Sequence, residues 1–98
     1  MFGEISIQKA QWLLANKPGI QLIDVRTPEE YHQGHISGSV NIPLTNIRSC
    51  SMAKNTPILV CCKSGGRALQ AKDILITMGY TDVISIGGIS GWRLTRGS

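Results

Sequence analysis

The 98-residue sequence lacks any long apolar segment, and its charges are sparse and scattered. No apolar run approaches the roughly 20 residues that a membrane-spanning helix needs. Charged residues make up 16% of the chain and the net charge is +4, with no block of like charge and no basic stretch with interleaved aromatic residues. These absences predict a globular domain that binds neither membranes nor nucleic acid, with a weak positive field that favours small anions.

A disulfide framework is not indicated by the cysteines. The chain has three, Cys50, Cys61 and Cys62. The number is odd, and two of the three are adjacent in a segment typical of a strand, where neighbouring side chains point to opposite faces. Residues 1–4 also lack the basic start and apolar stretch of a secretory signal. We therefore expect free thiols in a reducing compartment, the cytoplasm.

Linkers and internal repeats are absent too, and the length fits one domain over residues 1–98. Short apolar runs alternate with amphipathic stretches, which is typical of βαβ units and a mostly parallel sheet. The run at 58–62 has no polar alternation and is expected to be a central strand. The other expected strands are 2–5, 20–25, 39–42 and 82–86; the expected helices are 7–16, a short helix from a capping box at Thr27 to Gly34, and 67–78.

The segment between the central strand and the last helix carries the candidate chemistry. Cys62 ends the strand, and ligands of such folds bind beyond the carboxyl ends of strands. Two glycines after it allow backbone N–H groups to turn inward as an anion cradle, and two basic side chains and a helix N-terminus add positive charge. This setting favours the thiolate of Cys62, the reactive form of the side chain. The predicted anion-binding residues are Lys63, Ser64, Gly65, Gly66 and Arg67.

Three parts of the chain resemble the sequence signatures of the rhodanese family. The segment from Cys62 to Arg67 resembles the active-site loop, and the other signatures follow in the family's order across nearly the whole chain. The upstream segments are Asp24-Val25-Arg26, Glu30-Tyr31, Gly34-His35-Ile36, Gly38-Ser39 and Asn41-Ile42-Pro43, and the C-terminal one is Gly87-Gly88-Ile89-Ser90-Gly91-Trp92. One departure is Ala68, where many relatives place a hydroxyl residue. The resemblance implies an α/β, rhodanese-like fold with a five-stranded, mainly parallel sheet flanked by helices on both faces.

The resemblance also implies a thiosulfate sulfurtransferase that carries a sulfane sulfur as a persulfide of Cys62. The expected donor is thiosulfate or another small anionic sulfur compound or persulfide, and the acceptor is cyanide, a thiol or a protein cysteine. No metal and no organic cofactor is required, and no oligomeric state is predicted. Asp24, Arg26 and Glu30 are expected to support the structure, with an ion pair between Arg26 and the acids of the short helix.

Other interpretations of the same residues stay open. A cysteine-dependent phosphatase or arsenate reductase uses a similar loop, although the span from Cys62 to Arg67 is one residue shorter than the phosphatase pattern. A rhodanese-like interaction module often lacks the cysteine, which is present here. A thiol redox sensor would use Cys61, expected to face the core, or Cys50, expected to be partly exposed. His32 and His35 lack further metal ligands nearby, and Trp12 and Trp92 are expected to be packing residues rather than cofactor contacts.

Overall fold

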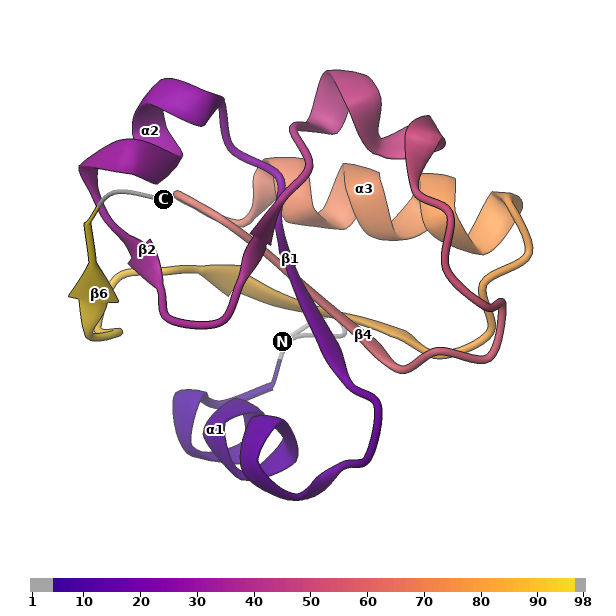
Figure 1. The fold of residues 1–98 in the computed structure, drawn as a ribbon, viewed down its shortest axis with the longest axis horizontal. Helices are drawn as coiled ribbons and strands as arrows, with labels where there is room; N and C mark the ends of the chain where they lie inside the picture. Colours follow the sequence, from indigo (N-terminus) through magenta and orange to yellow (C-terminus); the bar gives the residue numbers. More distant parts are fainter. Residues whose placement is uncertain (1–4, 97–98) are drawn as a thin grey trace.

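The computed structural model describes residues 5–96, in which a parallel sheet lies between helices (Figure 1). The sheet contains four parallel strands in the order β3 (Val40–Asn41), β1 (Gln21–Asp24), β4 (Ile58–Cys62) and β5 (Val83–Gly88). A separate antiparallel pair joins β2 (His35–Ile36) to β6 (Leu94–Thr95). The expected α/β architecture with a parallel sheet is confirmed.

The strand content differs from the expected five-stranded sheet in two respects. Of the strand expected at 2–5, residues 2–4 lie outside the described part of the chain, and Ile5 is not in a strand. The pair of β2 and β6 was not expected, because strands of two residues are too short to show an alternating pattern. This pair brings the C-terminal segment beside the end of the short helix (Figure 1).

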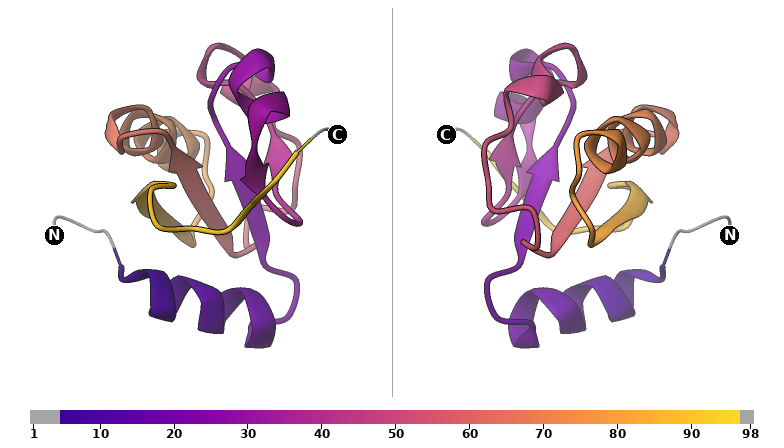
Figure 2. Two further views of the ribbon diagram at one scale, coloured as in Figure 1. Left: turned by 90° about the vertical axis from the view of Figure 1, so that its left-hand side faces the viewer. Right: turned by 90° about the vertical axis from the view of Figure 1, so that its right-hand side faces the viewer.

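The helices α1 and α2 begin where their capping residues predict. α1 (Ile7–Asn16) follows Ser6, whose side chain accepts a hydrogen bond from the backbone N–H of Lys9 at 3.1 Å. α2 (Pro28–Gln33) has the predicted capping box, the 3-10 helix η1 (Leu44–Ser49) follows β3, and α3 (Gly66–Thr77) follows β4. Figure 2 shows α1 on one face of the sheet and the other helices on the opposite face. No helix within residues 5–96 has the length and apolar content to cross a bilayer.

Strand β4 supplies the core on both faces of the sheet, and all five of its residues are buried. Ile58, Val60 and Cys62 pack into the cluster that contains α3 and η1, whereas Leu59 and Cys61 pack into the cluster that contains α1. Cys61 and Cys62 therefore lie on opposite faces, as neighbours on a strand must. The position of β4 between β1 and β5 confirms the prediction of a central strand.

Two side chains lie elsewhere than the sequence suggests. Trp12, expected to pack, is 57% exposed, because the inner face of α1 is built around Ala10 and Trp12 points away from it with Lys9 beside its ring. Cys50, expected to be partly exposed, is buried in the core. Cys50 is the C-cap of the unpredicted helix η1, and the hydroxyl of Tyr80 donates to the carbonyl of Cys50 at 3.1 Å, which holds this residue inward.

Candidate active site

Cys62 lies at the carboxyl end of β4, where backbone groups enclose its sulfur. The residue is 0% exposed. Its Sγ accepts hydrogen bonds from the backbone N–H of Gly65 at 2.9 Å and from that of Ala68 at 3.3 Å. Both donors belong to the start of α3, the end of the helix that carries partial positive charge. Two N–H donors directed at the sulfur are placed to stabilise negative charge that develops on it.

The contribution of Ala68 comes from its backbone. The side chain at this position lacks the hydroxyl of many relatives, yet the N–H that reaches the sulfur is present whatever the side chain. Among the predicted cradle residues, Gly65 is the one whose N–H bonds the sulfur, while Ser64 and Gly66 are exposed in the same loop. The first turn of α3 therefore belongs to the site together with the loop.

Two glycines allow the chain to close around the sulfur. Gly65 has φ +102°, a left-handed conformation that a residue with a side chain adopts only with strain. Gly88, on the neighbouring strand β5, lies directly against the loop, because a Cβ atom there would stand 2.5 Å from the carbonyl oxygen of Lys63. The absence of a side chain at Gly88 thus sets how closely the loop approaches the sheet.

An ion pair joins the cysteine loop to α2. The guanidinium of Arg67 donates to both carboxylate oxygens of Glu30, at 2.7 and 3.0 Å. Glu30 also accepts from the backbone N–H of Thr27 as part of the capping box. Arg67 was predicted to bind an anion; in this structure its guanidinium is engaged by Glu30. The pair fixes the first turn of α3 against the first turn of α2.

A second ion pair lies at the carboxyl end of β1 and is almost wholly buried. Arg26 donates to the carboxylate of Asp24, with Nη2 at 2.8 Å from Oδ2, and the same nitrogen donates to the carbonyl of Gly34 at 2.6 Å. The expected pairing of Arg26 with the acids of α2 is therefore wrong. The Asp24 carboxylate also accepts a hydrogen bond from the backbone N–H of Arg26, two residues further along the chain, and this local turn holds the two side chains together. Glu30 pairs with Arg67 instead.

The two adjacent cysteines have different surroundings. Cys61 is buried on the α1 side of the sheet, as expected, where burial and, after it, the Asp24 carboxylate raise the pKa of its thiol. The neutral thiol is therefore the stable form of Cys61. Cys62, whose sulfur receives two N–H groups, is the residue whose setting suits a nucleophile.

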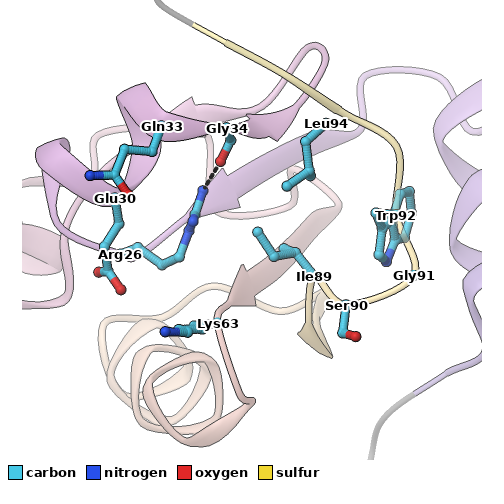
Figure 3. A pocket seen from close by; sticks show the side chains of 10 residues that line it. All are labelled: Arg26, Glu30, Gln33, Gly34, Lys63, Ile89, Ser90, Gly91, Trp92 and Leu94. Atoms are coloured by element: carbon cyan, nitrogen blue, oxygen red, sulfur yellow. Dashed lines mark hydrogen bonds between the residues drawn. The ribbon is translucent and has the colours of Figure 1, made fainter.

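A cavity of about 480 Å³ opens beside the loop, with Lys63 at its edge (Figure 3). Figure 3 shows two unlike walls. The polar wall comes from the segment after β1 and from α2, and consists of Arg26, Glu30 and Gln33. The apolar wall comes from the C-terminal segment and consists of Ile89, Trp92 and Leu94. Gln33 and Leu94 carried no sequence signal, whereas Ile89 and Trp92 lie in the C-terminal signature. Trp92 is half-buried in this wall.

Among residues 5–96, no three His, Cys, Asp or Glu side chains gather in a group suited to a metal ion. His35 instead stacks on the ring of Tyr31, with centroids 3.7 Å apart, and its Nδ1 lies 2.7 Å from the carbonyl oxygen of Tyr31. These contacts tie His35, the first residue of β2, to α2.

We expect the ion pair of Glu30 and Arg67 to make stability depend on pH. The hydrogen bonds from Arg67 lower the pKa of the Glu30 carboxyl from 4.5 to about 2. A lowered pKa in the folded state means that the stabilisation is complete above the unfolded value and is lost as the pH falls through the folded value. Glu30→Gln should therefore reduce the free energy of unfolding by about 1 kcal/mol at pH 7, after screening by solvent, and by progressively less between pH 4.5 and 2.

Urea unfolding at a series of pH values measures this difference. Glu29→Gln is the matched control, because Glu29 lies in the same turn of α2 and is exposed. We expect it to change the free energy of unfolding little at any pH. A gap between wild type and Glu30→Gln that stays constant from pH 7 to pH 2 would contradict the proposed contribution of the charged pair.

Comparison with known proteins gives one consistent result. The family model described as a rhodanese-like domain matches residues 8–95. Thiosulfate sulfurtransferase PspE of Escherichia coli is 44% identical over 71 residues, covering 68% of each chain, and thiosulfate sulfurtransferase 16 of Arabidopsis thaliana, a chloroplastic protein, is 39% identical over 89 residues, covering 76% of this chain and 74% of its own. A solved rhodanese with anions from E. coli superposes with a TM-score of 0.73 at 38% identity, over 80% of this chain and 99% of its own. The enclosed cysteine at the end of β4 and the loop around it are consistent with these relatives. The chain therefore belongs to the rhodanese-like domain family and is a sulfurtransferase of the rhodanese type.

Proposed function

We propose that this protein takes a sulfane sulfur from thiosulfate or a persulfide donor, holds it as a persulfide of Cys62 and passes it to a thiophilic acceptor. The observation that carries the proposal is the pair of backbone N–H groups, of Gly65 and Ala68, that bond the sulfur of Cys62. These donors stabilise the thiolate before transfer and again when the thiolate leaves. Two relatives are named as thiosulfate sulfurtransferases, which supports thiosulfate as a donor.

The first half-reaction loads the protein. The Cys62 thiolate attacks the outer sulfur of thiosulfate, a bond forms between the two sulfur atoms, and the bond from the outer sulfur to the sulfonate breaks. Sulfite leaves with the electron pair, and the negative charge of the thiolate now resides on the outer sulfur of the persulfide. No proton transfer is needed, because sulfite leaves as a stable anion. The activation barrier is lowered because the overall sulfur transfer is divided into two displacements.

The second half-reaction unloads it. A thiol, a protein cysteine or cyanide attacks the outer sulfur, the bond to Cys62 Sγ breaks, and Cys62 returns as a thiolate. With a thiol R–SH and the anionic persulfide, the products are R–S–SH and the thiolate, so charge and protons balance. No cofactor enters either step.

The two basic residues of the loop have different roles in this proposal. Lys63 is exposed at the edge of the cavity and is suited to attract an anionic donor. The guanidinium of Arg67 is held by Glu30 and so acts on the donor chiefly by positioning the loop. The rhodanese solved with anions supports an anion site in this fold. The cytoplasmic localisation stays a prediction from the cysteine count.

Intact-protein mass spectrometry after exposure to thiosulfate tests the proposal directly. We expect the mass to rise by one sulfur atom, and peptide mapping to place that atom on Cys62. Cyanide should then remove it in an amount equal to the thiocyanate formed. A protein that turns over thiosulfate without ever carrying the extra sulfur would rule out the persulfide route.

A further inference from the structure

The strand beside the cysteine loop, β5, carries one extra residue. Val60 of β4 pairs with Ser85, but the next residue of β4, Cys61, pairs with Gly87. Ile86 is therefore the extra residue of a β-bulge, which is an uncommon feature between parallel strands. Bulges occur often next to active sites, where they re-aim a side chain or end the pairing of strands. This bulge changes the register of β5 immediately before the cysteine loop begins.

The bulge determines which residue of β5 lies opposite Cys62. Cys62 pairs with Gly88, whereas in an unbroken register its partner would be Gly87. Gly88 is also the residue that lies against the loop, because a Cβ atom there would stand 2.5 Å from the carbonyl oxygen of Lys63. The backbone can make this step at Gly87, whose φ of +78° is left-handed. The loop therefore rests on a part of β5 whose position depends on the bulge.

A buried serine side chain holds the bulge. The Oγ of Ser85 accepts a hydrogen bond from the backbone N–H of Gly87 at 3.3 Å. A serine hydroxyl bonded to an N–H group two residues later gives the backbone a local partner in place of the ladder between strands. Ser85 is 0% exposed and stands between two isoleucines, Ile84 and Ile86. Because a buried polar group is costly unless it is hydrogen-bonded, this contact indicates that the hydroxyl serves the bulge rather than the core.

We propose that Ser85 is a positioning residue for sulfur transfer at Cys62. It acts through the bulge, which sets where Gly88 supports the carbonyl of Lys63, and the loop then brings the N–H of Gly65 to the sulfur at 2.9 Å. The serine hydroxyl takes no part in the chemistry itself. The inference rests on the proposed persulfide route and adds to it a residue outside the loop.

The test measures single-turnover loading of Cys62 at saturating thiosulfate, followed by intact mass. Ser85→Ala removes the hydroxyl that holds the N–H of Gly87. Since a misplacement of about 1 Å costs on the order of a hundredfold in rate, a loop displaced by about half that distance should load about tenfold more slowly. Val83→Ala is the matched control, because Val83 is buried on the same strand and pairs with Ile58 where the register is regular. It should load at close to the wild-type rate, although both alanine variants lose stability.

Threonine and valine in place of Ser85 separate the hydroxyl from the size of the side chain. The two side chains have nearly the same shape, but only threonine can accept the N–H of Gly87. Any crowding in this buried site affects both variants, so Ser85→Thr should load about fivefold faster than Ser85→Val, in line with the net contribution of one hydrogen bond. In amide NMR spectra, the signals of Gly65 and Ala68 should move in Ser85→Val and stay near their wild-type positions in Ser85→Thr. A role in stability alone would move neither.

The possible outcomes distinguish the inference from the proposed function. Equal loading rates of Ser85→Thr and Ser85→Val, or a Ser85→Ala rate that matches the wild type, would overturn the inference while leaving sulfur transfer intact. An equal loss of rate in Val83→Ala would do the same, since it would attribute the effect to stability. Circular dichroism checks that each variant is folded, and if both branched variants fail to fold, the comparison of Ser85→Ala with Val83→Ala decides. Wild-type protein that takes up no sulfur from thiosulfate would instead overturn the proposed function itself.

Discussion

Replacing Cys62 by serine is expected to abolish both sulfur loading from thiosulfate and the formation of thiocyanate from cyanide. A serine hydroxyl has nearly the same shape, so the N–H groups of Gly65 and Ala68 keep an acceptor and the fold is retained. The hydroxyl is a far weaker nucleophile and does not form the persulfide. Activity should fall to the rate of the reaction without protein, measured by thiocyanate release and by intact mass.

The other two cysteines supply the controls for this experiment. Cys61→Ala and Cys50→Ala each remove a buried thiol that is directed away from the enclosed sulfur site, Cys61 on the opposite face of the sheet and Cys50 beside Tyr80. Both variants should load one sulfur and release thiocyanate, with some loss of stability from the small cavity. Sulfur loading that is retained in Cys62→Ser and lost in Cys61→Ala would identify Cys61, on the opposite face of β4, as the sulfur carrier. That result would refute the assignment to Cys62.

A second large effect is expected from Gly88→Ala. The added Cβ would lie 2.5 Å from the carbonyl oxygen of Lys63, whereas ordinary contact begins at 3.4 Å, so the loop must move by nearly that difference. A misplacement of about 1 Å in a catalytic group costs on the order of a hundredfold in rate. We therefore expect sulfur loading to slow by about that factor, measured by single-turnover reaction with thiosulfate.

Gly66→Ala separates loop geometry from the general loss of a glycine. A Cβ at Gly66 meets no atom within 4 Å, and its φ is not positive. This variant should slow loading far less than Gly88→Ala, and it should favour α3 slightly because alanine is a better helix former. Circular dichroism of both variants checks that each is folded. Equal losses in the two would show that the approach of the loop to β5 does not control the reaction.

The elements with strong local signals were predictable from the sequence. The capping box from Thr27 to Glu30 begins α2, and the unbroken apolar run of β4 lies at the centre of the sheet with Cys62 at its end. Both features depend on neighbouring residues in the chain. The rhodanese-type loop was equally clear, because its residues are consecutive.

Contacts between distant residues were not predictable in the same way. The pairing of Arg67 with Glu30 spans 37 positions, and nothing in the sequence distinguishes it from the expected pairing of Arg26 with the same helix. The approach of Gly88 to Lys63 depends on the register of β5 against β4, which shifts at Cys61. The cavity wall at Leu94 exists because β6 pairs with β2, and two-residue strands carry no pattern to read.

The burial of the Cys62 sulfur also bears on the chemical durability of the protein. A thiolate is the form of cysteine that peroxides attack most readily, and oxidation beyond the sulfenic acid is irreversible for most proteins. Here the sulfur is 0% exposed and is enclosed by the backbone of Gly65 and Ala68, which leaves little room for the oxygen atoms of a sulfinic or sulfonic acid. We therefore expect the enclosure around the proposed sulfur carrier to slow its overoxidation between turnovers as well.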